Sequence, residues 1–145
     1  MVSETSIAGQ QLERRFVNQY VNENLRDVHF QTRVRLGPLP PGEDARLYMT
    51  KLHWADLVTF EPDTVTIFEA KLEPNSKAVG QLLEYKNLFF QSPHFAQYAT
   101  AQVNLVLLTS RINTAVQEVC EAQGIEYRVF RPDWIVPYEK RRWRY

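Results

Sequence analysis

Residues 53–72 read HWADLVTFEPDTVTIFEAKL, two strand-like runs joined by a turn. Both runs are rich in β-branched and aromatic residues, which favour strands. Pro62 and Asp63 stand in the connection, where a tight turn favours them. The stretch therefore predicts a β-hairpin with strands at about 53–60 and 65–72.

The register of this hairpin brings two carboxylates together. If Phe60 pairs with Val65 at the turn, Asp56 pairs with Glu69 further along the two strands. Directly opposed side chains share a face, with Cβ atoms roughly 5 Å apart, and Lys71 lies on the same face. Opposed carboxylates need a compensating cation, and oxygen ligands suit Mg²⁺ or Mn²⁺. We therefore expect a divalent metal site here.

Such a site predicts phosphodiester hydrolysis. A metal held by Asp56 and Glu69 can polarise a phosphate and acidify a bound water. Lys71 would orient that water, assist its deprotonation or stabilise the charge that builds on phosphorus. The alternative is an exposed strand face with cross-strand ion pairs, worth a few tenths of a kcal/mol. The apolar residues expected on the same face argue for burial and against that alternative.

The rest of the chain predicts one α/β domain with a mixed sheet and flanking helices. We expect helices at about 6–26, 77–91 and 112–123, and further strands at 28–36, 101–109 and 125–130. Ser76 is expected to cap the second helix and Gly124 to end the third. The strand–helix–strand unit spanning 65–109 is a crossover, so its two strands should be parallel.

The strand at 28–36 alternates strictly and predicts one buried face, formed by Val28, Phe30, Thr32, Val34 and Leu36. Arg33 and Arg35 fall on its polar face, which suits a rim that faces DNA. The residues that follow, GPLPPGED at 37–44, form a loop by their glycine and proline content, and we expect a mobile flap there.

"WAD" at 54–56 and "EAK" at 69–71, within the order α-β-β-β-α-β, resemble the PD-(D/E)XK nuclease superfamily. Ala55 stands where that superfamily usually has proline. The resemblance covers residues 6–109, and this chain adds a further α-β unit. It implies that Asp56, Glu69 and the backbone carbonyl of Ala70 bind the metal, with Lys71 as the catalytic cation.

Two helices extend the resemblance. The superfamily often supplies a glutamate from its first helix, and Glu13 is the matching candidate for metal binding and catalysis, with Glu23 as the fallback. An ordinary solvated role for Glu13 fits nearly as well. Gln81 and Tyr85 form a Gln-x-x-x-Tyr pattern similar to that of the RecB-type branch, and Lys77 lies one turn earlier. This face is expected to bind substrate, although a core role for Tyr85 is slightly favoured.

The composition limits the class of protein. The 145 residues contain 17 Lys plus Arg and 17 Asp plus Glu, so bulk charge does not predict nucleic-acid binding, although a local basic surface would. The single cysteine, Cys120, allows neither an internal disulfide nor a cysteine-bound cluster, and it suits a reducing cytoplasm. Neither a signal peptide nor a membrane span is recognisable. We expect a cytoplasmic, cluster-free member similar to RecB-type nucleases and Holliday-junction resolvases.

The predicted organisation is a nuclease-like domain at 1–131 and a basic, aromatic tail at 132–145. The tail could contact nucleic acid, with Trp143 stacking on a base, or it could be a solvated end or pack on a partner. The apolar stretch LFFQSPHF at 88–95 leaves a homodimer open, although core packing explains it equally well.

The sequence therefore predicts an Mg²⁺- or Mn²⁺-dependent DNA nuclease. The alternative is a non-catalytic subunit with a nuclease fold that binds nucleic acid or serves in assembly, as in a phage or mobile-element complex. The intact set of Asp56, Glu69 and Lys71 argues against that alternative, because degenerate members of the superfamily usually lose one of the three.

Overall fold

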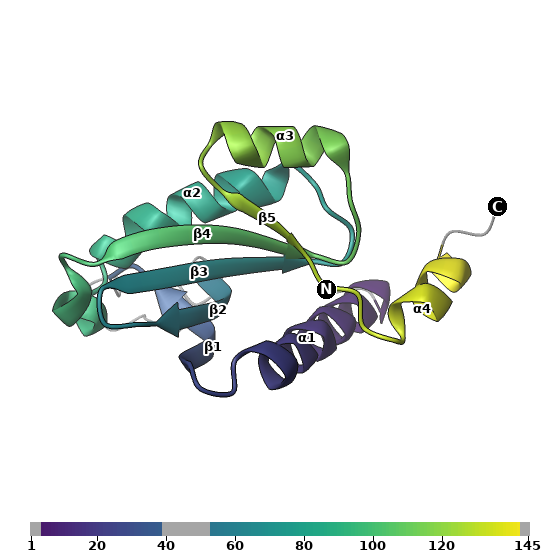
Figure 1. The fold of residues 1–145 in the computed structure, drawn as a ribbon, viewed down its shortest axis with the longest axis horizontal. Helices are drawn as coiled ribbons and strands as arrows, with labels where there is room; N and C mark the ends of the chain where they lie inside the picture. The colour runs from purple at the N-terminus through teal and green to yellow at the C-terminus, as the bar shows by residue number, and fades with distance from the viewer. Residues whose placement is uncertain (1–3, 39–52, 143–145) are drawn as a thin grey trace.

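The computed structural model describes residues 4–38 and 53–142, which form a five-stranded sheet with helices on both faces (Figure 1). The strands, in their order across the sheet, are β1 (His29–Leu36), β2 (His53–Phe60), β3 (Thr64–Lys71), β4 (Gln102–Thr109) and β5 (Glu126–Val129). The helices are α1 (Glu4–Asn24), α2 (Lys77–Phe90), α3 (Thr114–Ala122) and α4 (Ile135–Arg142), with a 3₁₀ segment η2 (Pro93–Tyr98). The prediction of a single α/β domain with a mixed sheet is confirmed.

The predicted hairpin and crossover both form. Phe60 pairs with Val65 and Val58 with Ile67, which is the predicted register. The turn is closed by a hydrogen bond of 2.9 Å from the amide of Glu61 to the carbonyl of Thr64. β3 and β4 run parallel, with α2 as the crossover between them. The turn chemistry and the apolar spacing were therefore sufficient to predict the centre of the sheet.

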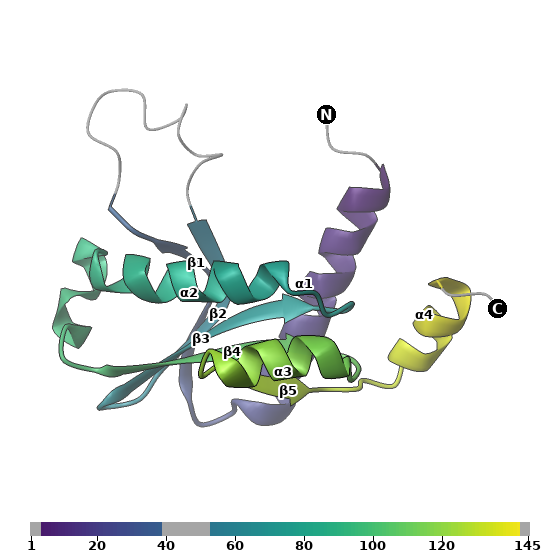
Figure 2. The ribbon, with the colours of Figure 1, turned by 90° about the horizontal axis from the view of Figure 1, so that it is seen from above.

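Two apolar clusters hold the layers together, one on each face of the sheet. Figure 2 shows α2 and α3 lying across one of these faces. The cluster beneath α2 and α3 includes Val58, Ile67 and Leu82. The cluster on the other face joins α1 to Leu57 and Phe68. Because the side chains of β3 alternate between the two clusters, both of its faces are buried. Glu69, near the end of the strand, is therefore buried as well.

The prediction for β1 is half wrong. Val34 and Leu36 are buried, but Phe30 is 37% exposed and Thr32 is also exposed. Val28 is partly buried and precedes the strand. β1 lies at the edge of the sheet, and the cluster beneath α2 contains only the second half of the strand. The alternation identified a strand correctly, but it could not show how far along that strand the helices extend.

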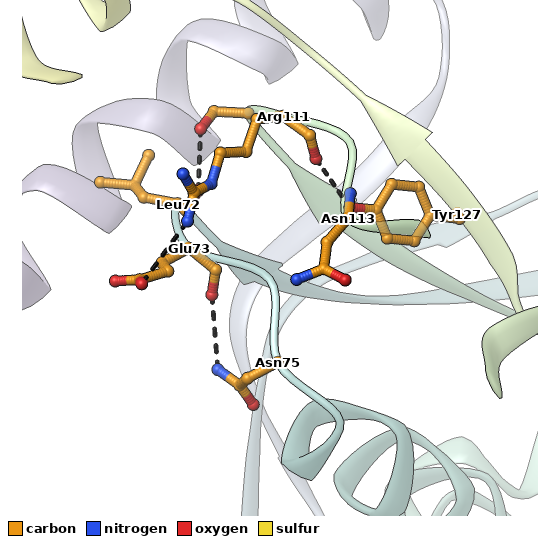
Figure 3. A network of polar contacts seen from close by, with 7 residues as sticks. Leu72, Glu73, Asn75, Arg111, Asn113 and Tyr127 are labelled. Atoms are coloured by element: carbon orange, nitrogen blue, oxygen red, sulfur yellow. Dashed lines mark hydrogen bonds and ion pairs between the residues drawn. The ribbon is translucent and has the colours of Figure 1, made fainter. Parts of the chain in front are cut away.

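The start of α2 differs from the prediction. Ser76 already has helical backbone angles and forms no side-chain cap, whereas the Asn75 side-chain oxygen accepts a hydrogen bond of 3.2 Å from the amide of Ala78. Asn75 also donates to the carbonyl of Glu73 at 3.4 Å (Figure 3). The helix is therefore capped one residue earlier than predicted.

Replacing Asn75 by alanine should lower the free energy of unfolding by about 1 kcal/mol, because the amide of Ala78 loses its side-chain acceptor and keeps only the bond of 3.3 Å to the backbone carbonyl of residue 75. Ser76→Ala is the matched control and should change stability by less than about 0.5 kcal/mol, the usual range for a surface position. Urea unfolding of both variants tests the assignment. A larger loss in Ser76→Ala than in Asn75→Ala would restore Ser76 as the cap.

Polar contacts join the segments that follow β3 and β4 to each other and to Tyr127 of β5 (Figure 3). The guanidinium of Arg111 lies 3.5 Å from the carboxylate of Glu73. The hydroxyl of Tyr127 donates to the carbonyl of Arg111 at 2.6 Å and accepts from the amide of Asn113 at 3.0 Å. Asn113 in turn caps α3, which Gly124 ends with a φ of 71°, as predicted. These contacts fix the ends of the strands from which α2 and α3 begin.

The region expected to be a tail contains α4. Ile135 is buried in the cluster beneath α1. Trp134 donates to the side chain of Gln19 at 2.8 Å, and the guanidinium of Arg15 lies 4.5 Å from the centre of its ring. Trp134 and Ile135, at the start of α4, therefore pack on α1 and its cluster, an arrangement that the sequence did not predict.

Two predictions concern residues that lie outside the described chain. They are the mobile flap, as far as it involves residues 39–44, and the stacking role of Trp143. In the stretch 88–95, Phe89 and Phe95 belong to the core, as packing predicted, while Phe90 is 49% exposed. Among the described residues, none of the helices is both long and apolar enough to cross a membrane.

Candidate active site

The predicted catalytic residues lie around one hollow of about 550 Å³. α1, β1, β2, β3 and α2 all contribute to its wall. Of the predicted site residues, the hollow is lined by Glu13, Asp56, Glu69, Lys71, Gln81 and Tyr85. Residues separated by more than seventy positions in the sequence thus meet at one place.

The predicted pairing of Asp56 with Glu69 does not form, because the pairing of β2 with β3 ends at Leu57 and Phe68, and Asp56 and Glu69 lie one residue beyond it. The Oδ2 atom of Asp56 accepts a hydrogen bond of 2.8 Å from the backbone amide of Ala70. The side chain of Asp56 therefore satisfies an amide on β3 where the described pairing has ended. This bond fixes one carboxylate oxygen and leaves the other available to the hollow.

Glu69 is an acid in an unfavourable position for a charge. Its residue surface is only 5% exposed, and its Oε2 atom has no hydrogen-bond partner in the described structure. Burial, reinforced by the charge of Asp56, raises the pKa of Glu69 to about 9. Lys71 opposes the shift, with its Nζ atom 3.8 Å from Glu69 Oε1, but does not cancel it. Lys71 alone therefore does not supply enough positive charge to keep both Asp56 and Glu69 ionised.

Glu13 reaches the same hollow from α1. Burial raises the pKa of its carboxyl, the charge of Lys71 lowers it, and the charge of Asp56 raises it, so Glu13 is coupled to both. Within residues 4–38 and 53–142, however, no three His, Cys, Asp or Glu side chains are placed to hold one metal ion. Glu13 is thus a third acid near the pair that does not complete a three-carboxylate site. Glu23 is exposed and does not line the hollow.

The residues predicted on α2 separate into three cases. The hydroxyl of Tyr85 donates to the carbonyl of Trp54 at 3.2 Å, and the ring lies in the core, so Tyr85 joins α2 to β2 as well as lining the hollow. Gln81 lines the hollow with a buried Oε1 atom that has no hydrogen-bond partner in the described chain. Lys77 is exposed at the start of α2 and does not line the hollow.

Eight further residues that were not predicted as site residues line the hollow, and three of them, Arg14, Arg33 and Trp54, are basic or aromatic. Arg14 adjoins Glu13, and Trp54 precedes Asp56 by two positions, so proximity in the sequence was the only available signal. Arg33 was expected to share a polar rim with Arg35. Instead, Arg35 donates to the carbonyl of Gly37 at 2.8 Å and contacts His94 at 3.4 Å, away from the hollow.

Comparison with known proteins shows likeness in fold. No family model matches the chain, and no curated protein matches it. A solved repair endonuclease from Pyrococcus abyssi aligns with a TM-score of 0.53 and 20% identity, over 84% of this chain and 47% of that one. EndoMS in complex with double-stranded DNA aligns with a TM-score of 0.51 and 17% identity, over 84% of this chain and 44% of that one. EndoMS in its apo form aligns with a TM-score of 0.51 and 18% identity, over 82% and 46%.

The chain spans about half the length of the structures it matches. At these identities the likeness concerns the fold. The fold seen here is similar to that of solved repair endonucleases, as the predicted resemblance implied. The closer resemblance to RecB-type enzymes and Holliday-junction resolvases stays a prediction.

Proposed function

We propose that this chain is a metal-dependent nuclease that hydrolyses DNA phosphodiester bonds in the hollow beside Asp56 and Glu69. The observation that carries the proposal is a carboxylate pair, with Glu69 buried and Asp56 half-buried, beside one lysine on a fold shared with repair endonucleases. A buried acid beside a second acid, with too little positive charge, is costly to stability, and such a carboxyl in a cleft is a candidate for a functional site. The EndoMS complex with double-stranded DNA supports DNA as the substrate.

The donor atoms fit Mg²⁺ or Mn²⁺. Asp56 and Glu69 supply carboxylate oxygens, and Glu69 Oε2 is buried without a hydrogen-bond partner among the described residues. The amide of Ala70 faces Asp56, and its carbonyl lies on the same side, because both groups of one residue point to the same neighbour in a strand. Mg²⁺ usually takes one or two carboxylates and completes its shell with waters and substrate phosphate, so a third carboxylate is not required.

The bound metal would acidify a water and polarise the phosphate. Lys71, on the same strand face as Glu69, would stabilise the negative charge that develops on the phosphoryl oxygens. Glu13 would assist the metal shell or the attacking water from α1. Gln81, with its unpartnered amide oxygen, would position a water or a substrate group, and Tyr85 would support that edge.

A cleavage assay tests the proposal directly. Purified protein is incubated with supercoiled plasmid, linear duplex, single strand and a four-way junction, each with Mg²⁺, Mn²⁺ or EDTA. We expect cutting that requires the metal, and the preferred DNA would identify the substrate. Absence of cutting on every substrate, with no thermal response to Mn²⁺, would instead favour a non-catalytic subunit of the nuclease fold.

Divalent cations should stabilise the protein in the absence of DNA. A cation at about 100 times its dissociation constant should raise the free energy of unfolding by about 2.7 kcal/mol, because it binds the folded pair alone. Thermal unfolding in Mg²⁺, Mn²⁺ and EDTA measures this effect. Asp56→Asn keeps an oxygen that can accept from Ala70 but removes the charge, and should lose the response. An equal response in that variant would place the metal elsewhere.

The remaining assignments are proposals of the same kind. A cytoplasmic location agrees with a single unpaired cysteine, Cys120, which is buried. We also propose that Lys77 contacts the substrate and that α4 and the residues after it contact DNA, and DNA-binding measurements on variants would test both roles. Sedimentation would test a homodimer. The RecB-like branch would be supported if duplex ends or single strands were the preferred DNA.

A further inference from the structure

Arg33 has a backbone conformation that arginine rarely adopts. Its φ is 52°, and within the described chain it is the single non-glycine residue with a positive φ. This left-handed region brings Cβ close to the following carbonyl, so it is populated mainly by glycine, asparagine and aspartate. It is more unusual still in the middle of a strand, where the backbone is otherwise extended.

The unusual residue stands directly opposite Asp56. Thr32 pairs with Leu57 and Val34 with Ala55, but the two residues between them, Arg33 and Asp56, are not paired. The pairing of β2 with β3 also ends just before Asp56. The sheet is therefore interrupted on both sides of the proposed metal ligand, and the strain in β1 coincides with that interruption.

The interruption changes which residues face the hollow. Ala55 and Val58 both pack in the cluster beneath α2, although residues three apart on a regular strand point to opposite faces. β2 therefore turns between them, and β1 turns with it at Arg33. As a result the side chain of Arg33 lines the hollow, while Arg35 contacts Gly37 and His94.

Among the residues that the structure describes, the charge of Arg33 has no partner. Its side chain is exposed and forms no hydrogen bond or ion pair within the described chain. The hollow holds three acids, and Lys71 already contacts Glu69. An arginine fork that is free beside this site is suited to a phosphate, which it can bind through two parallel N–H bonds.

We propose that Arg33 binds a phosphate of the DNA substrate, and that the strained conformation of β1 directs its guanidinium into the hollow. This rests on the proposed nuclease function and adds a substrate-binding residue to it. The strain then lowers the stability of the folded protein, and it is retained because it serves substrate binding. Stability and DNA affinity should therefore respond in opposite directions when Arg33 is replaced.

A set of matched variants tests this. Arg33→Asn and Arg33→Gln both remove the charge, but only asparagine tolerates the left-handed conformation. Arg33→Lys keeps the charge without the fork. Arg26→Gln removes the same charge from an exposed residue just after α1, whose side chain donates to the carbonyl of Asn22 at 3.4 Å. Each protein is assayed by thermal unfolding, by anisotropy of a labelled duplex in Ca²⁺ over a salt series, and by cleavage in Mn²⁺.

We expect Arg33→Asn to melt about 3 °C above Arg33→Gln, while both bind duplex about 10-fold more weakly than the unmodified protein. A plot of the logarithm of their affinity against the logarithm of the salt concentration should have a shallower slope, and the difference should correspond to about one phosphate contact. Arg33→Lys should recover part of the affinity, and Arg26→Gln should bind as the unmodified protein does. In cleavage, the Michaelis constant should rise more than kcat falls.

Each contrary result has a separate meaning. Normal DNA affinity in Arg33→Gln, with metal-dependent cutting intact, would overturn this inference and leave the nuclease proposal standing. Equal losses in Arg33→Gln and Arg26→Gln would show that only net charge matters, which also overturns it. Failure of the unmodified protein to bind or cut any DNA would overturn the proposed function, and the phosphate role of Arg33 with it.

Discussion

Lys71→Ala should reduce DNA cleavage by about 10³-fold while the protein remains folded, because it removes a positive group from the place where phosphoryl charge develops. The Nζ atom lies 3.8 Å from Glu69 Oε1, and the side chain is 25% exposed, so the truncation opens no cavity in either cluster. The loss should appear in kcat, since the interaction strengthens in the transition state.

The control for this variant is Lys86→Ala. Lys86 is an exposed lysine of α2 that does not line the hollow, and its removal changes the net charge equally. It should cut at the unmodified rate. Circular dichroism and melting of both variants would show that the fold is retained. Cleavage by Lys71→Ala at the unmodified rate would contradict the catalytic role of the lysine, even if the chain proves to be a nuclease.

Glu69→Gln should make the metal-free protein more stable at neutral and alkaline pH. Burial and the neighbouring Asp56 raise the pKa of Glu69 to about 9, whereas an unfolded glutamate has a pKa of 4.5. Between these values the folded state holds a proton that the unfolded state releases, so stability falls as pH rises. The slope is at most about 1.4 kcal/mol per pH unit for one group. Glutamine keeps the shape of the side chain and has no such proton.

Urea unfolding at pH 5, 7 and 9 in EDTA measures this effect. The unmodified protein should lose stability across the series, and Glu69→Gln should lose much less, with a residual slope from Glu13, whose pKa is also raised by burial. Mg²⁺ or Mn²⁺ should reduce the loss of stability between pH 5 and pH 9 in the unmodified protein and should not change it in the variant. Glu118→Gln, on the exposed surface of α3, is the control and should follow the unmodified protein. A Glu69→Gln variant less stable than the unmodified protein at pH 9 in EDTA would contradict the buried-acid description.

These two experiments separate chemistry from metal binding. Lys71→Ala should abolish cutting but keep the stabilisation by metal, since both carboxylates remain. Glu69→Gln should lose both. A protein that gains stability from Mn²⁺ through Asp56 and Glu69 but cuts no DNA would be a metal-binding scaffold with the same fold, which is the form that the non-catalytic alternative would take.

The parts of the fold that the sequence predicted depend on local rules. The register of Phe60 with Val65 follows from the turn and the period of two, and the parallel pairing of β3 with β4 follows from the helix between them. The same period brought Glu69 and Lys71 to one face of β3. For the site, this local information was enough to identify the hairpin residues, and the resemblance supplied Glu13, which the structure brings to the same hollow.

Local rules were insufficient where the outcome depends on how distant parts of the chain pack. Asn75 and Ser76 are both good caps, and the path of the chain after β3 decided for Asn75. α4 has a basic and aromatic sequence with little apolar content, and it is held by the packing of Trp134 and Ile135 on α1 and its cluster. β1 alternates strictly, yet only its second half is buried, because a strand pattern does not indicate where the covering helix ends.

By itself, then, the sequence determined the central hairpin, the crossover and the acidic pair with its lysine, because turn residues and side-chain periodicity act over a few positions. The tertiary structure alone decided that Arg33 lines the hollow and Arg35 does not. That difference arises from one left-handed residue opposite Asp56, where the pairing of β1 with β2 is interrupted. No local preference of arginine predicts such a conformation, since it is maintained by the packing of β1 and β2 beneath α2 against the preference of the residue itself.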